Sequence, residues 1–527
     1  MISIILSERD FDYEIQALVS SFFPGIHVNV FVADNLEEAG DKLDSSFIVI
    51  RISLQGKYVE TDITCGEHRV LASASVSGDD DWHKHAGKTA HPYRTYYKNI
   101  LKKLIFQQIS RFPEKKLPDG LNRRIPAWGT MTGVRPTKIA MNEILSGKSP
   151  EQVRKELRET YCCSEEKAEL GMQIASREAE ILKAADFENG YSLYIGIPFC
   201  PTTCLYCSFT SYPFEKFGNL AEDYLVALKK EISYVSEQAK GRKLTSIYIG
   251  GGTPTTLTAP QLDELISFVR ECFPVDEVSR TGKYSYEFTV EAGRPDSITE
   301  DKLKVLRKHG VDRISVNPQT MQQKTLELIG RKHTVLQTKE AFKMARELGF
   351  TNINMDLIIG LPGETVEEFE DTLARIEELN PDSVTIHSLV VKRASRLRST
   401  LEECDELYDD EKPLRMEKML QIGEKFAVRN GYLPYYMYRQ KNSAGHAGST
   451  GQENIGYARP GKECIYNILI MEEKQTILAV GAGASTKIYH RELGQVSRIE
   501  NVKSINDYID RIDEMIERKD GKLFENN

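Results

Sequence analysis

Short apolar runs alternate with amphipathic segments through the middle of the chain. The apolar runs are rich in Ile and Val and are bounded by Gly and Pro, which is typical of buried strands. Each run is followed by apolar residues at helical spacing. Six such units follow one another, with strands expected at 192–198, 244–254, 284–295, 311–319, 352–364 and 382–391. The alternation predicts an α/β fold, a parallel sheet that curls into a partial (β/α)6 barrel of the TIM type.

The segments on either side of this barrel have a different pattern. Strand candidates at 46–64 precede an amphipathic helix at 93–112 whose apolar spacing suits packing on a sheet. We therefore expect an α+β N-terminal domain, a helical connector, the barrel, and a C-terminal α+β cap that closes the barrel mouth. The expected boundaries are 1–120, 121–188, 189–410 and 411–527.

Composition narrows the class of protein. Of the 527 residues, 40% are hydrophobic, and no apolar run reaches the roughly 18 residues that a membrane span needs. The N-terminus lacks the basic segment of a signal peptide, and nine cysteines are too few for a disulfide scaffold. We expect a cytoplasmic protein without a membrane span.

The charge balance bears on the partners. A net charge of −9 argues against nucleic acid as a general partner. The exception is the stretch from Arg94 to Lys138, which holds eleven Lys and Arg residues. A solvated helix face is favoured there over a patch for RNA or an anionic ligand.

Three cysteines, Cys200, Cys204 and Cys207, lie within eight residues directly after the first barrel strand. A structural zinc site uses four ligands, and no fourth Cys or His follows at a suitable short spacing. Three thiolates suit three irons of a [4Fe–4S] cluster and leave the fourth iron open to an outside ligand. The spacing therefore predicts a catalytic cluster.

Other unusual residues also follow the expected strands. In barrels of this type the chemistry gathers at the carboxyl ends of the strands. A Gly-rich turn at 250–252 follows the second strand, and the remaining candidates are Thr253, Glu291, Gln319 and Asp356. We expect these residues to share one site with the cysteines.

These motifs together resemble the radical S-adenosylmethionine (radical SAM) family. The segments YIGIPFCPTTCLYC, IGGGTPT, VEAGRPD, NPQTMQQKTLELIGRKHT and NMDLIIGLPGE are similar to its oxygen-independent coproporphyrinogen III oxidase (dehydrogenase) branch. AWGTMTGVRPTK and ENIGYARPGKECIYNILIM resemble the HemZ-type members of that branch. The resemblance implies a [4Fe–4S] cluster on the three cysteines and two molecules of SAM.

The resemblance also implies which residues bind SAM. Tyr194, Gly251 and Glu291 correspond to contacts of the SAM that lies on the cluster. The second SAM corresponds to Tyr206, Gly252, Thr253, Gln319, Arg331 and Asp356. Alternatives remain for individual residues, because Arg331 could be a plain surface cation and Glu291 a solvated strand end.

The function implied is oxidative decarboxylation of coproporphyrinogen III propionates to vinyl groups, forming protoporphyrinogen IX in anaerobic heme biosynthesis. A low-potential electron donor and an electron acceptor would be partners. One departure matters: Phe209 stands where catalytic members usually carry a further cysteine, and the related heme chaperones also have an aromatic residue there. The alternatives are a heme-binding delivery protein of the same branch, or a radical SAM enzyme acting on heme or RNA.

A tetrapyrrole with four propionates needs cationic partners, since an unpaired buried carboxylate is costly. We expect cations near the barrel mouth from Lys392, Arg393, Arg439, Lys441, Arg459 and Lys487. Arg393 and Arg439 are the first candidates, because the guanidinium fork matches a carboxylate. His387 is interpreted as a packed core histidine in preference to a proton donor.

Overall fold

The computed structural model divides by its contacts into two compact units. One contains Met1–Ala175 and Arg439–Gln452, and the other contains Ser176–Tyr438 and Glu453–Asn527. The finer division into four domains stays a prediction. The structure describes residues 1–7, 9–32, 43, 45–55, 58–75, 92–207, 209, 211–275, 286–390, 397, 412–440 and 453–524.

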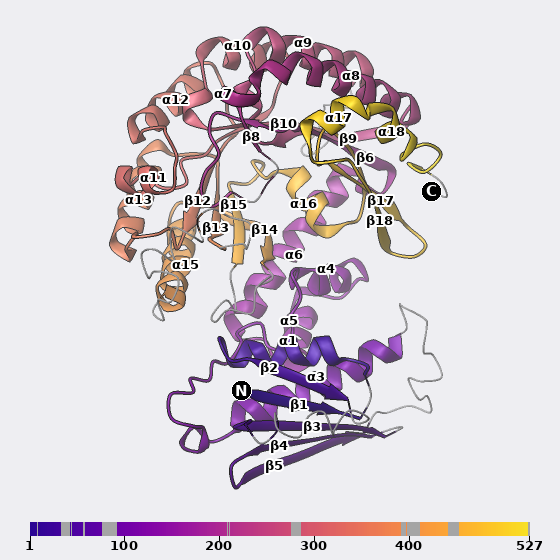
Figure 1. Ribbon diagram of the computed structural model, residues 1–527, viewed down its shortest axis with the longest axis vertical. Coiled ribbons are helices and arrows are strands. Elements are labelled where there is room, and N and C mark those ends of the chain that lie inside the picture. Colours follow the sequence, from indigo (N-terminus) through magenta and orange to yellow (C-terminus); the bar gives the residue numbers. More distant parts are fainter. Residues whose placement is uncertain are drawn as a thin grey trace. The chain divides into compact units, whose positions relative to one another are not determined.

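The first unit is built on a five-stranded sheet in the order β2-β1-β3-β4-β5 (Figure 1). β1 lies parallel to both its neighbours, whereas β3, β4 and β5 form an antiparallel meander. The strands are β1 (Ile2–Leu6), β2 (Val28–Val32), β3 (Ile48–Gln55), β4 (Tyr58–Cys65) and β5 (His68–Ser75). The helices are α1 (Asp12–Phe22), α3 (Pro92–Arg111), α4 (Thr137–Leu145) and α5 (Pro150–Glu159), with α6 (Glu165–Ala185) crossing the division.

The expected amphipathic helix of this unit is α3, and its packing on the sheet is confirmed. Leu101, Ile105 and Ile109 are buried in one core with residues of β1, β3 and β4. The basic stretch is partly structural. Lys102 is buried, and its ammonium donates to Thr132 Oγ1 at 3.0 Å. Burial lowers the pKa of Lys102 to about 8, with help from the charge of Lys98.

The second unit contains the expected parallel sheet. Its eleven strands run in the order β14-β15-β13-β12-β11-β10-β9-β6-β16-β17-β18. Six of them lie parallel in chain order and confirm the partial barrel (Figure 1). They are β6 (Gly190–Ile197), β9 (Lys243–Gly251), β10 (Glu287–Gly293), β11 (Arg313–Val316), β12 (Ile353–Ile359) and β13 (Ser383–Ser388).

Helices follow these strands and lie outside the curved sheet (Figure 1). Three begin with a reciprocal capping box, in which a threonine and the Gln or Glu three residues later satisfy each other's backbone N–H groups. These are α9 (Ala259–Cys272), α12 (Val335–Glu347) and α13 (Val366–Leu379). The others are α7 (Phe214–Phe217), α8 (Ala221–Gln238), α10 (Glu300–Lys308), α11 (Gln323–Leu328) and α15 (Lys412–Arg429).

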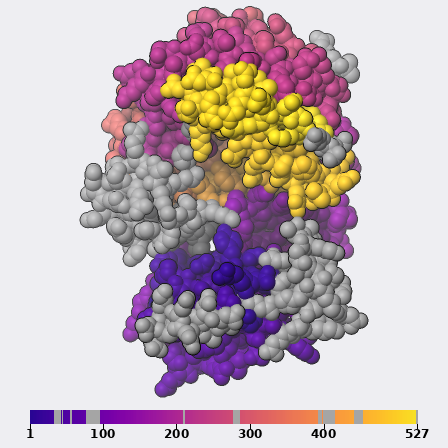
Figure 2. Space-filling view, turned by 45° about the vertical axis from the view of Figure 1, so that its right-hand side comes forward, coloured from indigo at the N-terminus to yellow at the C-terminus, as the bar shows by residue number. Residues whose placement is uncertain are grey.

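The C-terminal strands extend the same sheet at both edges. β15 (Glu453–Ala458) pairs antiparallel with β13, and β14 (Leu433–Arg439) lies beyond it. At the other edge β16 (Thr476–Val480) pairs parallel with β6, followed by β17 (Ser485–His490) and β18 (Gln495–Glu500). The remaining helices are α16 (Ile465–Glu472), α17 (Ile505–Asp510) and α18 (Ile512–Glu517). Figure 2 shows the C-terminal residues, in yellow, against the barrel residues in magenta.

A buried ion pair fixes this C-terminal segment to α8. Lys519 Nζ lies 2.6 Å from Glu231 Oε1, and both side chains have no exposed surface. Glu231 also accepts from Asn501 Nδ2 and from the backbone N–H of Gly481, each at 2.8 Å. The carboxylate therefore holds the turn after β16 beside the end of β6. Over the described residues, none of the helices has the length and hydropathy of a membrane span.

Candidate functional site

The three cysteines lie on the loop that leaves β6 at its carboxyl end. Phe199 and Cys200 form a short parallel ladder with Tyr212 and Pro213, which closes the loop at its base. Farther along, the backbone N–H of Leu205 donates to Ile329 O at 3.0 Å. The loop is thus closed at its base and hydrogen-bonded to the barrel unit between Cys204 and Cys207, and all three thiols are half-buried.

Each cysteine sulfur has a polar neighbour from a different segment. Thr253 Oγ1 lies 3.4 Å from Cys200 Sγ, Arg294 Nη1 lies 3.7 Å from Cys204 Sγ, and Ser211 Oγ lies 3.8 Å from Cys207 Sγ. Burial raises the pKa of the Cys200 thiol to about 11, while the hydroxyl of Thr253 acts in the opposite direction. Such donors suit thiolates, because hydrogen bonds to sulfur stabilise the negative charge.

The donor set fits a cluster better than a single ion. Within the described part of the chain, no three His, Cys, Asp or Glu side chains converge on a position for one metal ion. Thiolates that bind different irons of a cluster stand farther apart than the ligands of one ion. Three sulfurs on one anchored loop therefore match three corners of a [4Fe–4S] cluster.

The glycine turn after β9 packs against the start of the cysteine loop. The backbone N–H of Gly252 donates to Ile197 O at 2.7 Å, and that of Thr253 donates to Phe199 O at 2.6 Å. A Cβ at Gly252 would lie 2.5 Å from Phe199 O, closer than real contacts allow. Gly251 has a φ of 105°, which favours glycine. The absence of a side chain at Gly252 thus lets the turn pack closely against the start of the cysteine loop. From the sequence, the expectation is that the glycines make room for SAM.

Glu291 ends β10 beside this turn. Its carboxylate accepts the hydroxyl of Tyr248, and a Cβ at Gly250 would lie 3.0 Å from the carboxyl carbon. Burial raises the pKa of Glu291 to about 7, and the charge of Asp356 acts in the same direction. The hydrogen bonds from Tyr248 and from the backbone N–H of Gly251 oppose that rise. Glu291 is therefore a half-buried acceptor inside the barrel and not a solvated strand end.

Three tyrosines stack beside Glu291. The ring centroids of Tyr194 and Tyr248 are 6.2 Å apart, and those of Tyr248 and Tyr466 are 4.4 Å apart. Tyr194 lies on β6 and Tyr248 on β9, whereas Tyr466 comes from α16. The carboxylate of Glu287 caps that helix, since it accepts from the backbone N–H of Ile465 at 2.9 Å. Sequence reasoning missed Tyr248, Tyr466 and Glu287. For Tyr248 and Glu287 the available signal was a polar residue inside an apolar strand, and Tyr466 on α16 had no such signal.

Arg331 and Tyr206, both implied as contacts of the second SAM, lie in direct contact. Arg331 Nη1 donates to Tyr206 Oη at 3.0 Å, and Nη2 donates to Asn317 O at 3.0 Å. Arg331 is only 4% exposed, so it is not a plain surface cation. Its Nε is buried and has no hydrogen-bond partner within the described residues. A buried donor of this kind is costly unless a ligand or water meets it.

Gln319 and Asp356 face each other across neighbouring strands. The backbone N–H of Gln319 donates to Asp356 O at 2.9 Å, and Gln319 has a φ of 67°, unusual for a residue other than glycine. The side-chain oxygen of Gln319 is buried without a partner among the described residues. Asn354 Nδ2 donates to Asp356 Oδ1 at 2.7 Å, and His387 Nε2 lies 3.8 Å from the same oxygen. Burial would raise the pKa of Asp356, but the hydrogen bond and charge of His387 outweigh it and hold that pKa low.

Three of the cations expected for the substrate lie within the described residues, namely Arg439, Arg459 and Lys487. Arg439 belongs to the first unit, where Nη1 donates to Met131 O at 2.7 Å. Arg459 donates to Asn380, which precedes β13, so it lies at the amino ends of the strands. Lys487 is paired with Ile477 near the start of β16 and contacts Glu473 at 3.3 Å. Both Arg459 and Lys487 therefore lie near the amino ends of the parallel strands. The expectation that these two residues lie near the barrel mouth, at the carboxyl ends, is wrong. Lys392, Arg393 and Lys441 lie outside the described residues.

Comparison with known proteins shows which family model and which relatives this chain is similar to. Residues 194–376 match the family model of the Radical SAM superfamily. The oxygen-independent coproporphyrinogen-III oxidase-like protein HemZ of Bacillus subtilis (strain 168) is 42% identical over 395 residues, which cover 74% of this chain and 76% of that protein. The heme chaperone HemW of the same organism is 32% identical, covering 61% and 76%. The oxygen-independent coproporphyrinogen III oxidase of Escherichia coli (strain K12) is 32% identical, covering 46% and 51%.

The barrel and its three-cysteine loop thus define a radical SAM protein, the class whose members use a [4Fe–4S] cluster and SAM. Within that class the chain belongs to the family of oxygen-independent coproporphyrinogen-III oxidase-like HemZ proteins.

Proposed function

We propose that this protein catalyses oxidative decarboxylation of coproporphyrinogen III propionates. Each turnover removes one hydrogen atom from the propionate carbon next to the ring, then CO2 and one electron, and leaves a vinyl group. The electron passes to an acceptor. The bound cluster supplies, on reduction, the electron that cleaves SAM to methionine and a 5′-deoxyadenosyl radical.

The observation that carries the proposal is the position of the three-cysteine loop at the carboxyl ends of the barrel strands, next to Glu291. Cys200, Cys204 and Cys207 are assigned to three irons of the cluster, and the fourth iron remains for SAM. Glu291 would accept the ribose hydroxyls or the amine of SAM, beside Tyr194 and Gly251. The buried ring stack behind Glu291 excludes water from this side, which strengthens each polar contact.

A second SAM would be held by the buried groups that lack partners. The Nε of Arg331 and the side-chain oxygen of Gln319 are oriented without a hydrogen bond inside the described structure. A SAM carboxylate and amine could satisfy both. Asp356, whose pKa is held low, would remain ionised to accept from a ribose or an ammonium group. Tyr206, Gly252 and Thr253 complete this proposed set.

A second candidate function is heme binding and delivery, and one residue favours it. Phe209 lies two residues after Cys207 in the cysteine loop, in place of a further cysteine, and 76% of its surface is exposed. An exposed aromatic ring offers a stacking surface for a planar tetrapyrrole. The heme chaperones among the relatives give this alternative its second support.

An anaerobic assay separates the two candidates. The reconstituted protein is incubated with SAM, a strong reductant, an electron acceptor and coproporphyrinogen III, and harderoporphyrinogen and protoporphyrinogen are measured after oxidation by fluorescence. Both products should form with the unmodified chain and not with Cys204→Ala. Absence of products, with stoichiometric heme binding that Phe209→Ala weakens, would replace the enzyme by the delivery protein.

A further inference from the structure

Arg294 lies between a carboxylate and the cysteine loop. It follows β10, and its residue is only 3% exposed. Its Nε and Nη2 donate to the two oxygens of Asp296 at 2.9 and 2.6 Å. Its Nη1 points the other way, 2.9 Å from Thr202 Oγ1 and 3.7 Å from Cys204 Sγ. The Nη1 side of the guanidinium, which does not contact Asp296, therefore faces Thr202 and the sulfur of Cys204.

The charges around this guanidinium leave an excess of positive charge. Burial would raise the pKa of Asp296, but Arg294 outweighs it and keeps that carboxyl ionised. His333 is fully buried nearby, and burial together with the charge of Arg331 lowers its pKa to about 3, so the imidazole is neutral. The guanidinium groups of Arg294 and Arg331 and the carboxylate of Asp296 thus carry one net positive charge.

The other two cysteines have different neighbours. Cys200 faces the hydroxyl of Thr253, and Cys207 faces that of Ser211. Among the hydrogen bonds between described residues, Arg294 therefore gives the one charged donor to a cysteine sulfur. The hydroxyl of Tyr206, a residue that the resemblance assigns to the second SAM, also hydrogen-bonds to Cys204, but it is a neutral partner.

We propose that Arg294 sets the reduction potential of the cluster by donating to Cys204 and by placing positive charge beside it. This inference rests on the assignment of the three cysteines under the proposed function. Reduction adds negative charge to the cluster, so a nearby cation and an N–H···S hydrogen bond favour the reduced form. The effect is strong at this site because Arg294 is buried and solvent screens it little.

The test is a redox titration of the full-length, anaerobically reconstituted protein without SAM, followed by electron paramagnetic resonance. Iron and sulfide are measured first in every variant. In Arg294→Met, which keeps much of the side-chain volume, the equilibrium constant of reduction should fall at least tenfold, a shift of about 59 mV to more negative potential for one electron. Arg294→Lys should recover most of the loss.

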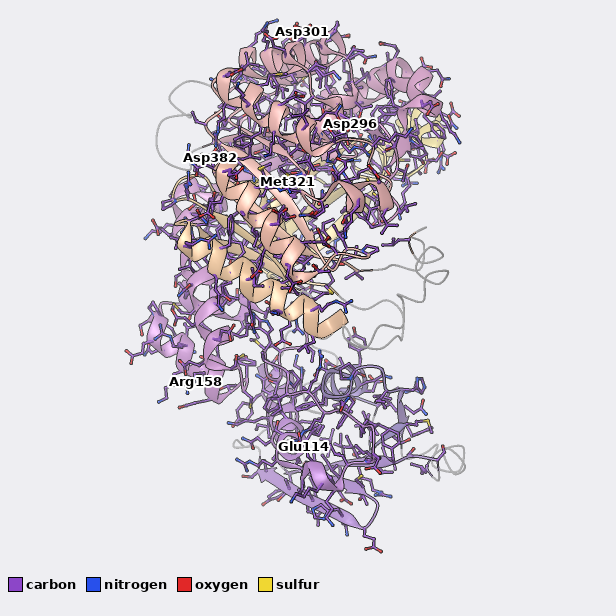
Figure 3. All side chains as sticks on the ribbon, turned by 90° about the vertical axis from the view of Figure 1, so that its left-hand side faces the viewer. Glu114, Arg158, Asp296, Asp301, Met321 and Asp382 are labelled. Atoms are coloured by element: carbon purple, nitrogen blue, oxygen red, sulfur yellow. The ribbon has the colours of Figure 1, made fainter. Side chains whose placement is uncertain are left out.

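Two further variants sharpen the result. In Asp296→Asn the carboxylate charge is lost, so the potential should move in the positive direction. Arg346→Met is the matched control, because Arg346 also pairs with a carboxylate, Asp382, at 2.6 Å, and with a backbone carbonyl. Figure 3 shows Asp296 and Asp382 well apart in this unit. The control should leave the potential unchanged.

The outcomes are separable. Equal potentials in Arg294→Met and the unmodified chain, at equal iron content, would overturn the role of Arg294 while the ligand assignment stands. If Arg294→Met assembles no cluster, Asp296→Asn decides: a more positive potential supports the proposal, and an unchanged or more negative one overturns it. An unmodified chain that assembles no cluster overturns the ligand assignment and this inference with it.

Discussion

Tyr466 stacks on Tyr248 with ring centroids 4.4 Å apart and ring planes inclined by 22°. The contact joins α16 to β9, and the hydroxyl of the same Tyr248 donates to Glu291. A helix from the C-terminal segment thereby completes the surroundings of a carboxylate in the barrel. Glu287 holds that helix by its first turn, so a residue at the start of β10 supports the site at the end of the same strand.

The stack predicts how Tyr466 affects the site. Tyr466→Ala removes an aromatic pair worth about 0.5–1.5 kcal/mol and admits water to Glu291. SAM binding should weaken several-fold, measured by equilibrium dialysis of the reconstituted protein. Tyr466→Phe keeps the ring and should bind SAM as the unmodified chain does. Equal affinities in the Ala and Phe variants would show that the stack does not support the SAM site.

Glu291 predicts a pH dependence. Its pKa of about 7 lies above the ordinary value, so the carboxyl becomes protonated as the pH falls through 7. If the carboxylate accepts from SAM, the affinity for SAM should be nearly constant above about pH 8 and fall by up to about tenfold between about pH 8 and pH 6. Glu291→Gln has no group to titrate and should bind weakly at every pH. A Gln variant that keeps the slope of the unmodified chain would assign the titration to another group.

Cluster assembly should depend on the loop cysteines alone. Cys204→Ala should abolish the broad absorption near 400 nm that iron–sulfur clusters show, and lower the iron content, because removal of a ligand usually removes the site. Cys272 is a half-buried thiol on α9, and Cys272→Ala serves as the control with full iron content. A cluster that survives in Cys204→Ala would contradict the assignment.

The structure changes the expected effect of a substitution at Gly252. Sequence reasoning treats the glycine turn as room for SAM, but a Cβ at 252 would collide with the backbone of the cysteine loop. Gly252→Ala should therefore lower iron incorporation itself, not only SAM cleavage. Gly133, whose Cβ would meet nothing within 4 Å, is the control and should tolerate Ala. Normal iron content in Gly252→Ala would return the turn to SAM alone.

The buried pair of Lys519 and Glu231 should matter for stability. Lys519→Met leaves a buried carboxylate without its cation, which costs about 3–5 kcal/mol. Lys230 of α8 pairs with Asp513 of α18 at 2.5 Å, but the two side chains are 52% and 75% exposed, so Lys230→Met should change stability by less than about 1 kcal/mol. Urea unfolding compares the two. Similar midpoints would show that the buried pair is not needed to hold the C-terminal segment.

The barrel strands could be predicted because each is a local apolar run followed by a helix. The position of β16 could not, because its pattern fits any buried strand and its partner is distant in sequence. The hydrogen bond between Ser192 and Gln475, for example, joins residues 283 positions apart. Arg294 was missed for the same reason. Beside Pro295 it looks like an ordinary turn residue, and only the folded barrel brings it to Cys204.

The pairing of β6 with β16 has a consequence for the order of events during synthesis. β6 directly precedes the cysteine loop, and its second neighbour is made only when residues 476–480 leave the ribosome. At about 5–20 residues per second, that interval lasts roughly 15–60 seconds. For this time the strand has an open edge, which favours pairing with other chains. The synthesis of β16 thus ends the period in which the strand before the cysteine loop lacks its second neighbour.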